Sequence, residues 1–349
     1  MVTITIKDIA RETGFSLTTV SAVLRNKSRD LQIKPETERL ILETADKLGY
    51  VRSSLALEMR TGQSSAIAIL RPYRPFDFLF TATLQAEITA AQSGYSIRNI
   101  YVKEETGADF SAILDRIISL RPAALITCTD FGSNKKTLTE CVRKHKLPWL
   151  SLDFHDPDAD INAGTDDKSG IEIAVGHLVS LGHTRIAHAT DTLKAQYADV
   201  RFRAFCDAMR SRGLAVDESL CFHDYFLQDS SKLKQYAARI AAMKNPPTAI
   251  CCGSDYMAVK LMMLLPRCGL RIPEDISLIA YGGLSVSALC EPVLTSVLQP
   301  FEQMTDMAIR ELLKLVRKEP FLNEIKMVPV LKPGETVLPC KETNTRKGK

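Results

Sequence analysis

The chain has 349 residues, of which 45% are hydrophobic, and a formal net charge of +4. This length predicts two or three domains with a substantial core, and the composition excludes a disordered chain. No run approaches the roughly 18 apolar residues of a membrane span, and the first eleven residues lack the apolar centre of a signal peptide. We therefore expect a cytoplasmic protein, and nine cysteines without regular spacing fit thiols that stay reduced there.

Two short amphipathic helices joined by a glycine turn are predicted near the N-terminus. Thr5 and Asp8 have the spacing of a capping box for the first helix, Gly14 makes the turn, and Ser16 caps the second helix. The predicted outward face of the second helix is small and polar, as a helix that enters the major groove requires. Taken alone, the pattern also fits an ordinary capped helical hairpin. The outward positions are Leu17, Thr18, Ser21, Ala22 and Arg25.

A third helix is predicted to begin at Lys34 or Pro35 and to end at Gly49, so that three helices share one small core. The first 62 residues carry only a slight excess of basic side chains, and charge alone does not indicate DNA binding. A local cluster must supply the phosphate contacts, and residues 25–34 are rich in arginine and lysine. Residues 51–62 follow as a segment too short to form a stable isolated helix, which indicates a hinge.

Ordered motifs continue through almost the whole chain, and together they resemble one family. The matching segments are Thr5-Ile-Lys-Asp-Ile-Ala, Ser16-Leu-Thr-Thr-Val-Ser, Leu48-Gly-Tyr, residues 55–62, Gly94-Tyr95, Asp166-Asp167 with Gly170, residues 181–186, 254–258 and 272–277, and Gln299-Pro300. They are similar to the LacI/GalR (lactose-repressor) family. The resemblance implies a DNA-binding headpiece at 1–50, a hinge at 51–62, a two-lobed effector-binding and dimerisation domain at 63–340, and a basic tail at 341–349.

The body of the chain is predicted to hold two parallel sheets. From Ser65 onward, short apolar runs alternate with helical segments, which is typical of strands buried on both faces. The expected fold is thus an all-α helix-turn-helix headpiece followed by an α/β, periplasmic-binding-protein-like domain. Its first lobe would take residues 66–163 and 294–330, and its second lobe residues 164–292. The predicted strands are 66–70, 96–101, 124–128, 149–153, 185–189, 249–252 and 276–281.

The resemblance also implies which residues bind DNA. Leu17, Thr18 and Ala22 would read bases, and Met59 of the hinge would insert into the minor groove with Arg60 beside it. Relatives often have arginine at the position of Ala22 and asparagine at that of Arg25, so we expect an altered operator sequence. An ordinary linker turn is the alternative for the hinge. Residues expected to hold the DNA backbone are Thr5, Ser16, Thr19, Ser21 and Arg25.

A small-molecule effector, carbohydrate or a related metabolite, is expected between the lobes. Arg201 aligns with an arginine that grips the ligand in many relatives, although a surface arginine with a weak salt bridge is the competing interpretation. Ser254 and Gly282 stand where relatives often have side chains that hold sugar hydroxyls, which argues against a hexose bound in the usual manner. Weaker candidates for effector contact are Phe78, Asp130, Asp153, Tyr197 and Tyr225.

No enzyme or cofactor motif is found. Residues 164–169 mimic the end of a phosphate loop, but Asp167 places a carboxylate where phosphate would lie. Asp156, Asp158 and Asp160 have the spacing of a calcium loop, but Ile161 replaces its glycine, so we expect a solvated acidic loop.

The sequence thus predicts a homodimeric transcription repressor that binds a pseudopalindromic operator in double-stranded DNA. The alternative is a ligand-binding module whose headpiece has lost specific operator recognition.

Overall fold

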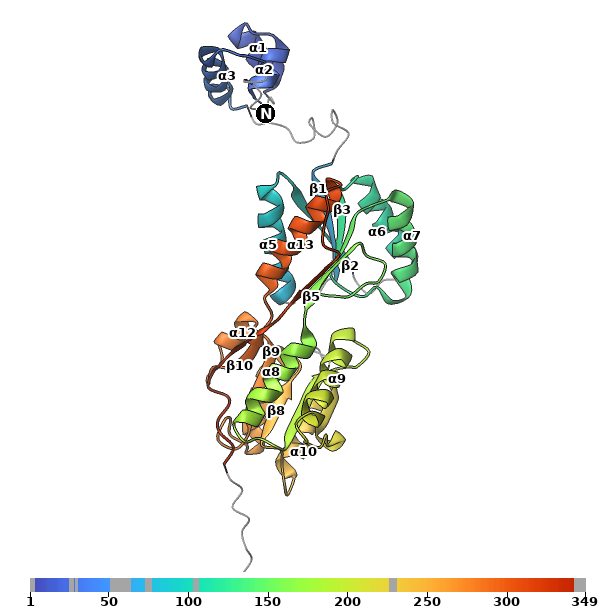
Figure 1. Cartoon of the computed structure of the whole chain (residues 1–349), viewed down its shortest axis with the longest axis vertical. Helices are drawn as coiled ribbons and strands as arrows, with labels where there is room; N and C mark the ends of the chain where they lie inside the picture. Colours follow the sequence, from blue (N-terminus) through green and yellow to red (C-terminus); the bar gives the residue numbers. More distant parts are fainter. Residues whose placement is uncertain are drawn as a thin grey trace, which may run out of the picture. The chain divides into compact units, whose positions relative to one another are not determined.

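The structure, a computed structural model, describes residues 4–24, 28, 31–50, 64–72, 77–102, 107–225 and 231–341 (Figure 1). Contacts divide the chain into two units, residues 1–63 and 64–349, and each is described by itself. No helix among these described ranges has both the length and the apolar character needed to cross a bilayer.

The first unit contains three helices around one small core. Helix α1 spans Ile6–Thr13, α2 spans Leu17–Val23 and α3 spans Pro35–Lys47. Gly14 adopts a φ of 72°, which a residue with a Cβ rarely adopts, and so turns the chain between α1 and α2. The three helices are held by buried apolar side chains from each of them. These are Ile9, Val20, Val23, Ile41 and Ala45.

The second unit is built from two six-stranded sheets. The order of the first is β11-β5-β4-β3-β1-β2, and that of the second is β12-β10-β9-β8-β6-β7. The first sheet comprises β1 (Ala66–Pro72), β2 (Ser96–Val102), β3 (Ala124–Thr127), β4 (Trp149–Leu152), β5 (Ile161–Thr165) and β11 (Glu324–Met327). The second comprises β6 (Ile186–Asp191), β7 (Cys221–Tyr225), β8 (Ala249–Cys252), β9 (Ser277–Gly282), β10 (Thr295–Leu298) and β12 (Val330–Lys332).

Helices cover both faces of each sheet (Figure 1). On the first sheet, α5 (Asp77–Gln92) and α13 (Phe301–Val316) pack on one face, and α6 (Gly107–Ser119) and α7 (Lys135–His145) on the other. On the second, α8 (Asp167–Ser180) and α9 (Gln196–Arg210) face α10 (Ser231–Ala242) and α11 (Asp255–Leu264) across the strands. The central strands are therefore buried on both sides, which explains their continuous apolar runs.

The predicted strands are confirmed, but the border between the lobes is wrong at two places. Thr295–Leu298 forms β10 and pairs in parallel with β9, so this segment belongs to the second sheet and not to the first. The expected border at residue 163 falls inside β5, which pairs with β4 up to Ala163 and with β11 up to Thr165. The chain passes between the sheets after β5, after β10 and after β11.

Gly170 gives a test of how tightly α8 packs on the second sheet. Gly170→Ala should lower the free energy of unfolding by about 1–3 kcal/mol, because the new methyl would overlap the Tyr281 ring and lie 2.6 Å from Pro329. The matched control is Gly176→Ala in the same helix, where the methyl meets the flexible end of Arg212 and helix propensity improves. Urea denaturation measures both, and equal midpoints would contradict the tight contact.

Candidate DNA interface and effector site

The N-terminus of α2 presents an ordered, exposed turn. The Ser16 hydroxyl oxygen accepts a hydrogen bond from the Thr19 N–H at 3.1 Å and lies 2.9 Å from the Thr19 hydroxyl. This cap fixes the first turn while Thr18 stays exposed and Leu17 is 48% exposed. Ser21, one turn on, is half-buried. The start of α2 is thus a rigid element with small polar groups and one apolar side chain facing solvent.

Thr5 anchors the start of α1 through Asp8. The backbone N–H and the hydroxyl of Thr5 both donate to Asp8 Oδ2, at 2.9 and 2.7 Å. These bonds lower the pKa of Asp8, with a further contribution from Arg11, whose Nη2 lies 2.8 Å from Asp8 Oδ1. The carboxylate therefore stays ionised and satisfies the first turn of the helix.

Ala22 does not lie on the outward face, contrary to the sequence prediction. It is only 7% exposed and belongs with Val20 and Val23 among the buried residues of α2. An alanine methyl lies close to the helix backbone, so modest packing is enough to shield it from solvent. The predicted outward exposure of Ala22 is therefore wrong, whereas its contact with a base stays a prediction. Arg25, Met59 and Arg60 lie outside the described residues.

Arg201 forms the centre of a polar cluster in the second unit. It is 6% exposed, so the competing interpretation as a surface arginine is wrong. Its Nε lies 3.1 Å from Asp167 Oδ2, its Nη2 lies 3.3 Å from Asp167 Oδ1, and its Nη1 donates to the Gly253 carbonyl at 2.8 Å. Burial lowers the pKa of Arg201, but Asp167, Tyr281 and Asp153 together raise it more, so the guanidinium remains charged.

Two tyrosines enclose this guanidinium. Its carbon lies 4.2 Å from the ring centre of Tyr281 and 5.1 Å from that of Tyr197. The Tyr281 hydroxyl donates to Asp167 Oδ1 at 2.7 Å, and the Tyr197 hydroxyl donates to Asp191 Oδ2 at 2.7 Å. Both rings thus add cation–π attraction while their hydroxyls fix the neighbouring carboxylates.

Asp153 joins the cluster from the first sheet. It follows β4 directly, has a φ of 60°, and is half-buried. Burial and the nearby Asp167 carboxylate raise the pKa of Asp153 to about 7, while Arg201 opposes them. The structure thus brings together three of the predicted residues, Asp153, Tyr197 and Arg201. It adds Asp167 and Asp191 to the cluster.

Ser254 and Gly282 lie beside a second buried carboxylate, that of Asp255. The Ser254 hydroxyl oxygen accepts from the Met257 N–H at 3.3 Å and caps α11. A Cβ at Gly282 would lie 3.0 Å from Asp255 Oδ2, so this glycine makes room for that carboxylate. Asp255 accepts a 2.6 Å hydrogen bond from the Ser296 hydroxyl. The side chains of Ser254 and Asp255 therefore already have structural partners.

The remaining predicted effector residues are Asp130, Phe78 and Tyr225. Asp130 is exposed, and its carboxylate accepts a hydrogen bond from the Gly132 N–H at 2.9 Å, which closes a turn after β3. The side chains of Phe78 and Tyr225 lie outside the described part of the chain.

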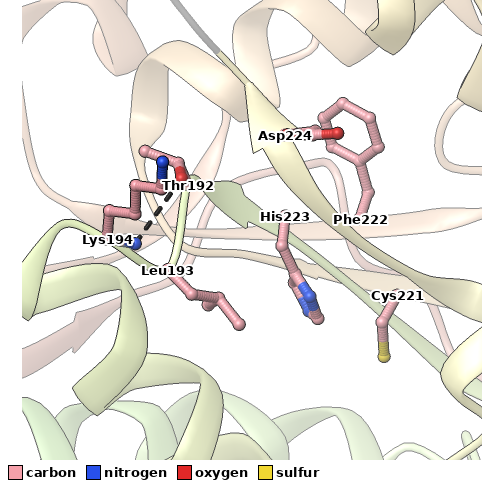
Figure 2. A pocket seen from close by; sticks show the side chains of 7 residues that line it. All are labelled: Thr192, Leu193, Lys194, Cys221, Phe222, His223 and Asp224. Carbon is pink, nitrogen blue, oxygen red and sulfur yellow. Dashed lines mark hydrogen bonds between the residues drawn. The ribbon is translucent and has the colours of Figure 1, made fainter.

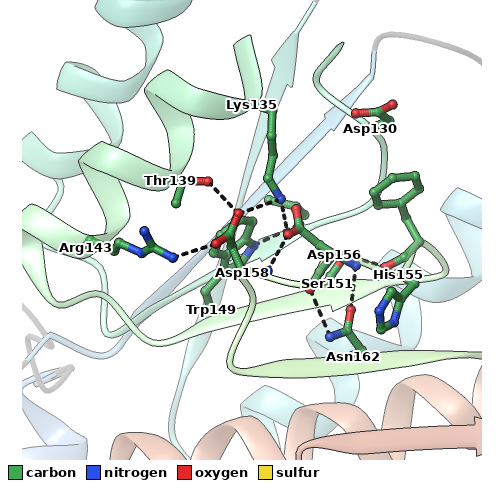
Figure 3. Close-up of polar contacts among 12 residues, drawn as sticks. Asp130, Lys135, Thr139, Arg143, Trp149, Ser151, His155, Asp156, Asp158 and Asn162 are labelled. Atoms are coloured by element: carbon green, nitrogen blue, oxygen red, sulfur yellow. Dashed lines mark hydrogen bonds and ion pairs between the residues drawn. The ribbon is translucent and has the colours of Figure 1, made fainter. Parts of the chain in front are cut away.

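The acidic loop after β4 is an ion-pair network, not the solvated loop that we expected (Figure 3). Asp156 is buried and ion-paired with Lys135, and its Oδ1 accepts from the Asp158 N–H at 2.9 Å. Asp158 pairs with Arg143 at 2.6 Å, and Asp160 accepts from the backbone N–H at the start of β4 at 2.8 Å. The chain's own donors therefore occupy these carboxylates, and no metal-binding group of three is found among the described residues.

Two hollows lie outside the Arg201 cluster. One of about 590 Å³ lies between the end of β6 and β7 and is shown in Figure 2. Another of about 390 Å³ is lined by residues of α5, α13 and β11. The first begins at Thr192, directly after Asp191, and so adjoins the cluster along the chain. Its lining residues are Thr192, Leu193, Lys194, Cys221, Phe222, His223 and Asp224.

Comparisons with known proteins agree with this geometry. Residues 5–53 match the model for bacterial regulatory proteins of the lacI family, and residues 175–337 match a periplasmic binding protein-like domain. The chain belongs to the lacI family. As a lacI-family member, it is a DNA-binding transcriptional regulator with a ligand-binding domain.

Relatives and solved structures extend the likeness to nearly the full length. The HTH-type transcriptional repressor PurR of Vibrio campbellii is 28% identical over 95% of this chain and 98% of its own length. That of Vibrio cholerae is 29% identical with the same coverage. The fold matches a lac repressor dimer bound to operator and the anti-inducer ONPF, at 21% identity and a TM-score of 0.82, over 97% of this chain and 100% of that one.

Sequence reasoning missed several residues of the Arg201 cluster in this lacI-family protein. Asp167 and Gln299 stood in quoted motifs, and Gln299 Nε2 donates to the Thr165 hydroxyl at 3.1 Å. Asp167 was set aside because it excludes a phosphate loop, and that same negative charge is what pairs with Arg201. Tyr281 and Asp191 end buried strands, and their position at the carboxyl ends of β9 and β6 was the available signal.

The raised pKa of Asp153 predicts a pH-dependent stability. Because the folded protein binds this proton more tightly than the unfolded chain, stability that is present at low pH is lost as the pH rises toward about 7. Asp153→Asn removes the titrating group, so its advantage over the native chain should grow between about pH 5 and pH 8. Urea denaturation across this range measures the difference, and a difference that does not change with pH would contradict the assignment.

Proposed function

We propose that the protein is a homodimeric repressor that acts in the cytoplasm, binds a pseudopalindromic operator, and responds to a small-molecule effector held at the Arg201 cluster. The observation that carries the DNA-binding part is the first turn of α2, where Ser16 and Thr19 fix a cap and Leu17 and Thr18 face solvent. An apolar side chain and hydroxyls at a helix N-terminus are suited to thymine methyls, base edges and phosphates.

An exposed apolar stripe on α5 supports a dimer. Phe80, Leu84 and Ile88 follow each other at four-residue spacing and are all exposed. α13 packs beside α5 and contributes the exposed Met307. A stripe of this kind on the first lobe suits an isologous contact with a second copy, which would place two headpieces on one twofold axis.

The proposed effector site is supported by polar side chains that come together from both lobes. Asp153 comes from the first sheet, whereas Arg201, Asp167 and Asp191 come from the elements of the second sheet. His155 and Gln196 also join the two lobes through 3.4 Å contacts between the amide of Gln196 and the backbone of His155. A carbohydrate or related metabolite bound to such groups would change how the two lobes approach each other, and lobe movement is the signal we assign to the effector.

Selection of oligonucleotides from a random pool tests the operator. We expect recovered sites to share a half-site repeated with twofold symmetry. Leu17→Ser should weaken binding to the selected site by about 1–3 kcal/mol, because it removes an apolar base contact. Leu40→Ser is the matched control, since Leu40 on α3 is 47% exposed against 48% for Leu17.

The contrary result would be that the recovered sites share no half-site and that salt abolishes binding equally for every sequence. That result would favour a ligand-binding module whose headpiece has lost specific recognition.

A thermal-shift screen with sugars, sugar acids, nucleosides and phosphosugars tests the effector. A true ligand stabilises the folded protein by RT ln(1 + [L]/Kd). Arg201→Ala should abolish that shift, and it should also lower the unliganded midpoint because it leaves the half-buried Asp167 carboxylate without its partner. Arg203→Ala is the control on the same helix, since Arg203 is exposed and its ion pair is a local one with Asp199, one helical turn away. An undiminished shift in Arg201→Ala would contradict the assigned site.

A further inference from the structure

A second buried arginine, Arg71, lies near the end of β1. It is 7% exposed, and its Nη1 donates to the Thr83 hydroxyl at 2.5 Å. The guanidinium carbon lies 5.4 Å from the ring centre of Tyr101, its register partner on β2. Its Nε is buried and has no hydrogen-bond partner among the described residues. The side chain is thus held in place, but its hydrogen-bonding capacity is only partly used.

Arg71 also lacks a counter-charge within the described ranges. No ion pair joins it to an aspartate or glutamate of those ranges, whereas Arg201 is neutralised by both oxygens of Asp167. A buried cation without a paired anion is strongly unfavourable, and Thr83 and Tyr101 supply only a neutral hydroxyl and a ring face. Within the described ranges the two buried arginines therefore differ, since Arg201 is paired with a carboxylate and Arg71 is not.

The position of Arg71 connects it to the Arg201 cluster. Leu70 is in register with Thr127, so Arg71 lies beside Cys128 at the carboxyl ends of β1 and β3. Burial raises the pKa of the Cys128 thiol to about 12, the Arg71 charge opposes this, and the Asp153 charge adds to it. One thiol thus lies within electrostatic range of both Arg71 and Asp153. Carboxyl ends of parallel strands are where ligands bind in open α/β sheets.

We propose that Arg71 binds an anionic group of the effector, a carboxylate or a phosphate, while hydroxyl groups of the same molecule face Asp153 and Arg201. This inference rests on the proposed effector site and adds its charge class. A planar guanidinium with a free Nε offers parallel N–H donors to an oxyanion, and an oxyanion also supplies the missing counter-charge. Asp153 and Asp191 oppose a second anionic group, so the acidic end of the molecule lies toward Arg71 and its hydroxyl-bearing end toward Arg201.

Arg71→Met tests, without any ligand, whether the Arg71 charge is unpaired and destabilises the folded protein. Methionine keeps an apolar stem of similar length and removes the charge, so the midpoint of thermal unfolding should rise by about 2–4 °C. If Arg71 were a structural anchor for Thr83 and Tyr101, the midpoint would fall instead, and that result would overturn the proposal. Arg98→Met is the control, since Arg98 is an exposed arginine of the neighbouring strand β2.

Simple oxyanions test the binding site itself. Inorganic phosphate and formate are compared with chloride at equal ionic strength, on the native chain and on both variants. We expect one or both oxyanions to raise the midpoint by about 2–4 °C more in the native chain and in Arg98→Met than in Arg71→Met. Arg71→Lys should keep part of this response because the charge remains. Equal responses in the native chain and Arg71→Met would overturn the proposal.

Failure of this inference can be told apart from failure of the proposed function. D-glucose, D-gluconate and D-glucose 6-phosphate share one carbon skeleton and differ in charge. A shift with glucose that Arg201→Ala abolishes and Arg71→Met leaves unchanged would keep the effector site and overturn the anionic class. A shift with gluconate or glucose 6-phosphate that Arg71→Met removes would support the inference and identify which oxyanion is bound.

Discussion

The ion pair between the buried Arg201 and Asp167 is the interaction on which the carboxyl-end edge of the second sheet depends. Asp167 begins α8, and Arg201 lies in the middle of α9. The remaining donors of Arg201 reach the Gly253 carbonyl after β8 and the Gln299 side chain after β10, and Tyr281 at the end of β9 bonds to Asp167. One charge pair therefore joins five segments that are distant in the sequence. Removing either partner would leave an unpaired charge in their midst.

The same pair lies beside the places where the chain passes between the lobes. Asp167 follows β5 after one residue, and Gln299 follows β10 directly. Gln299 contacts both Arg201 at 3.4 Å and Thr165 at 3.1 Å. A ligand that competes for Arg201 would therefore act on two of the connections between the lobes. Such differential contacts are what an effector needs to shift one lobe arrangement toward another.

Much of this fold could be predicted because its central strands are continuous apolar runs. Strands that lack such a run were not foreseen: β5 reads Ile-Asn-Ala-Gly-Thr, and β12 has only three residues. The exposure of Ala22 was predicted wrongly because helical periodicity gives the direction in which a side chain points but not how far a small methyl group is shielded from solvent. Arg201 was found through resemblance, whereas the roles of Asp191 and Arg71 can be recognised only from their burial and their neighbours. Those properties arise only when distant strands are placed side by side.

The ion-pair network of the acidic loop gives this protein an intrinsic optical reporter. Trp149 is the only tryptophan of the chain, and its indole N–H donates to the Thr127 hydroxyl at 2.9 Å. The Lys135 ammonium lies 5.1 Å from the Trp149 ring centre and is ion-paired with Asp156, three residues beyond Asp153. Tryptophan emission therefore comes from one place, beneath the loop that carries a predicted effector contact. A charge moved by ligand binding in that loop would change the field on a single fluorophore.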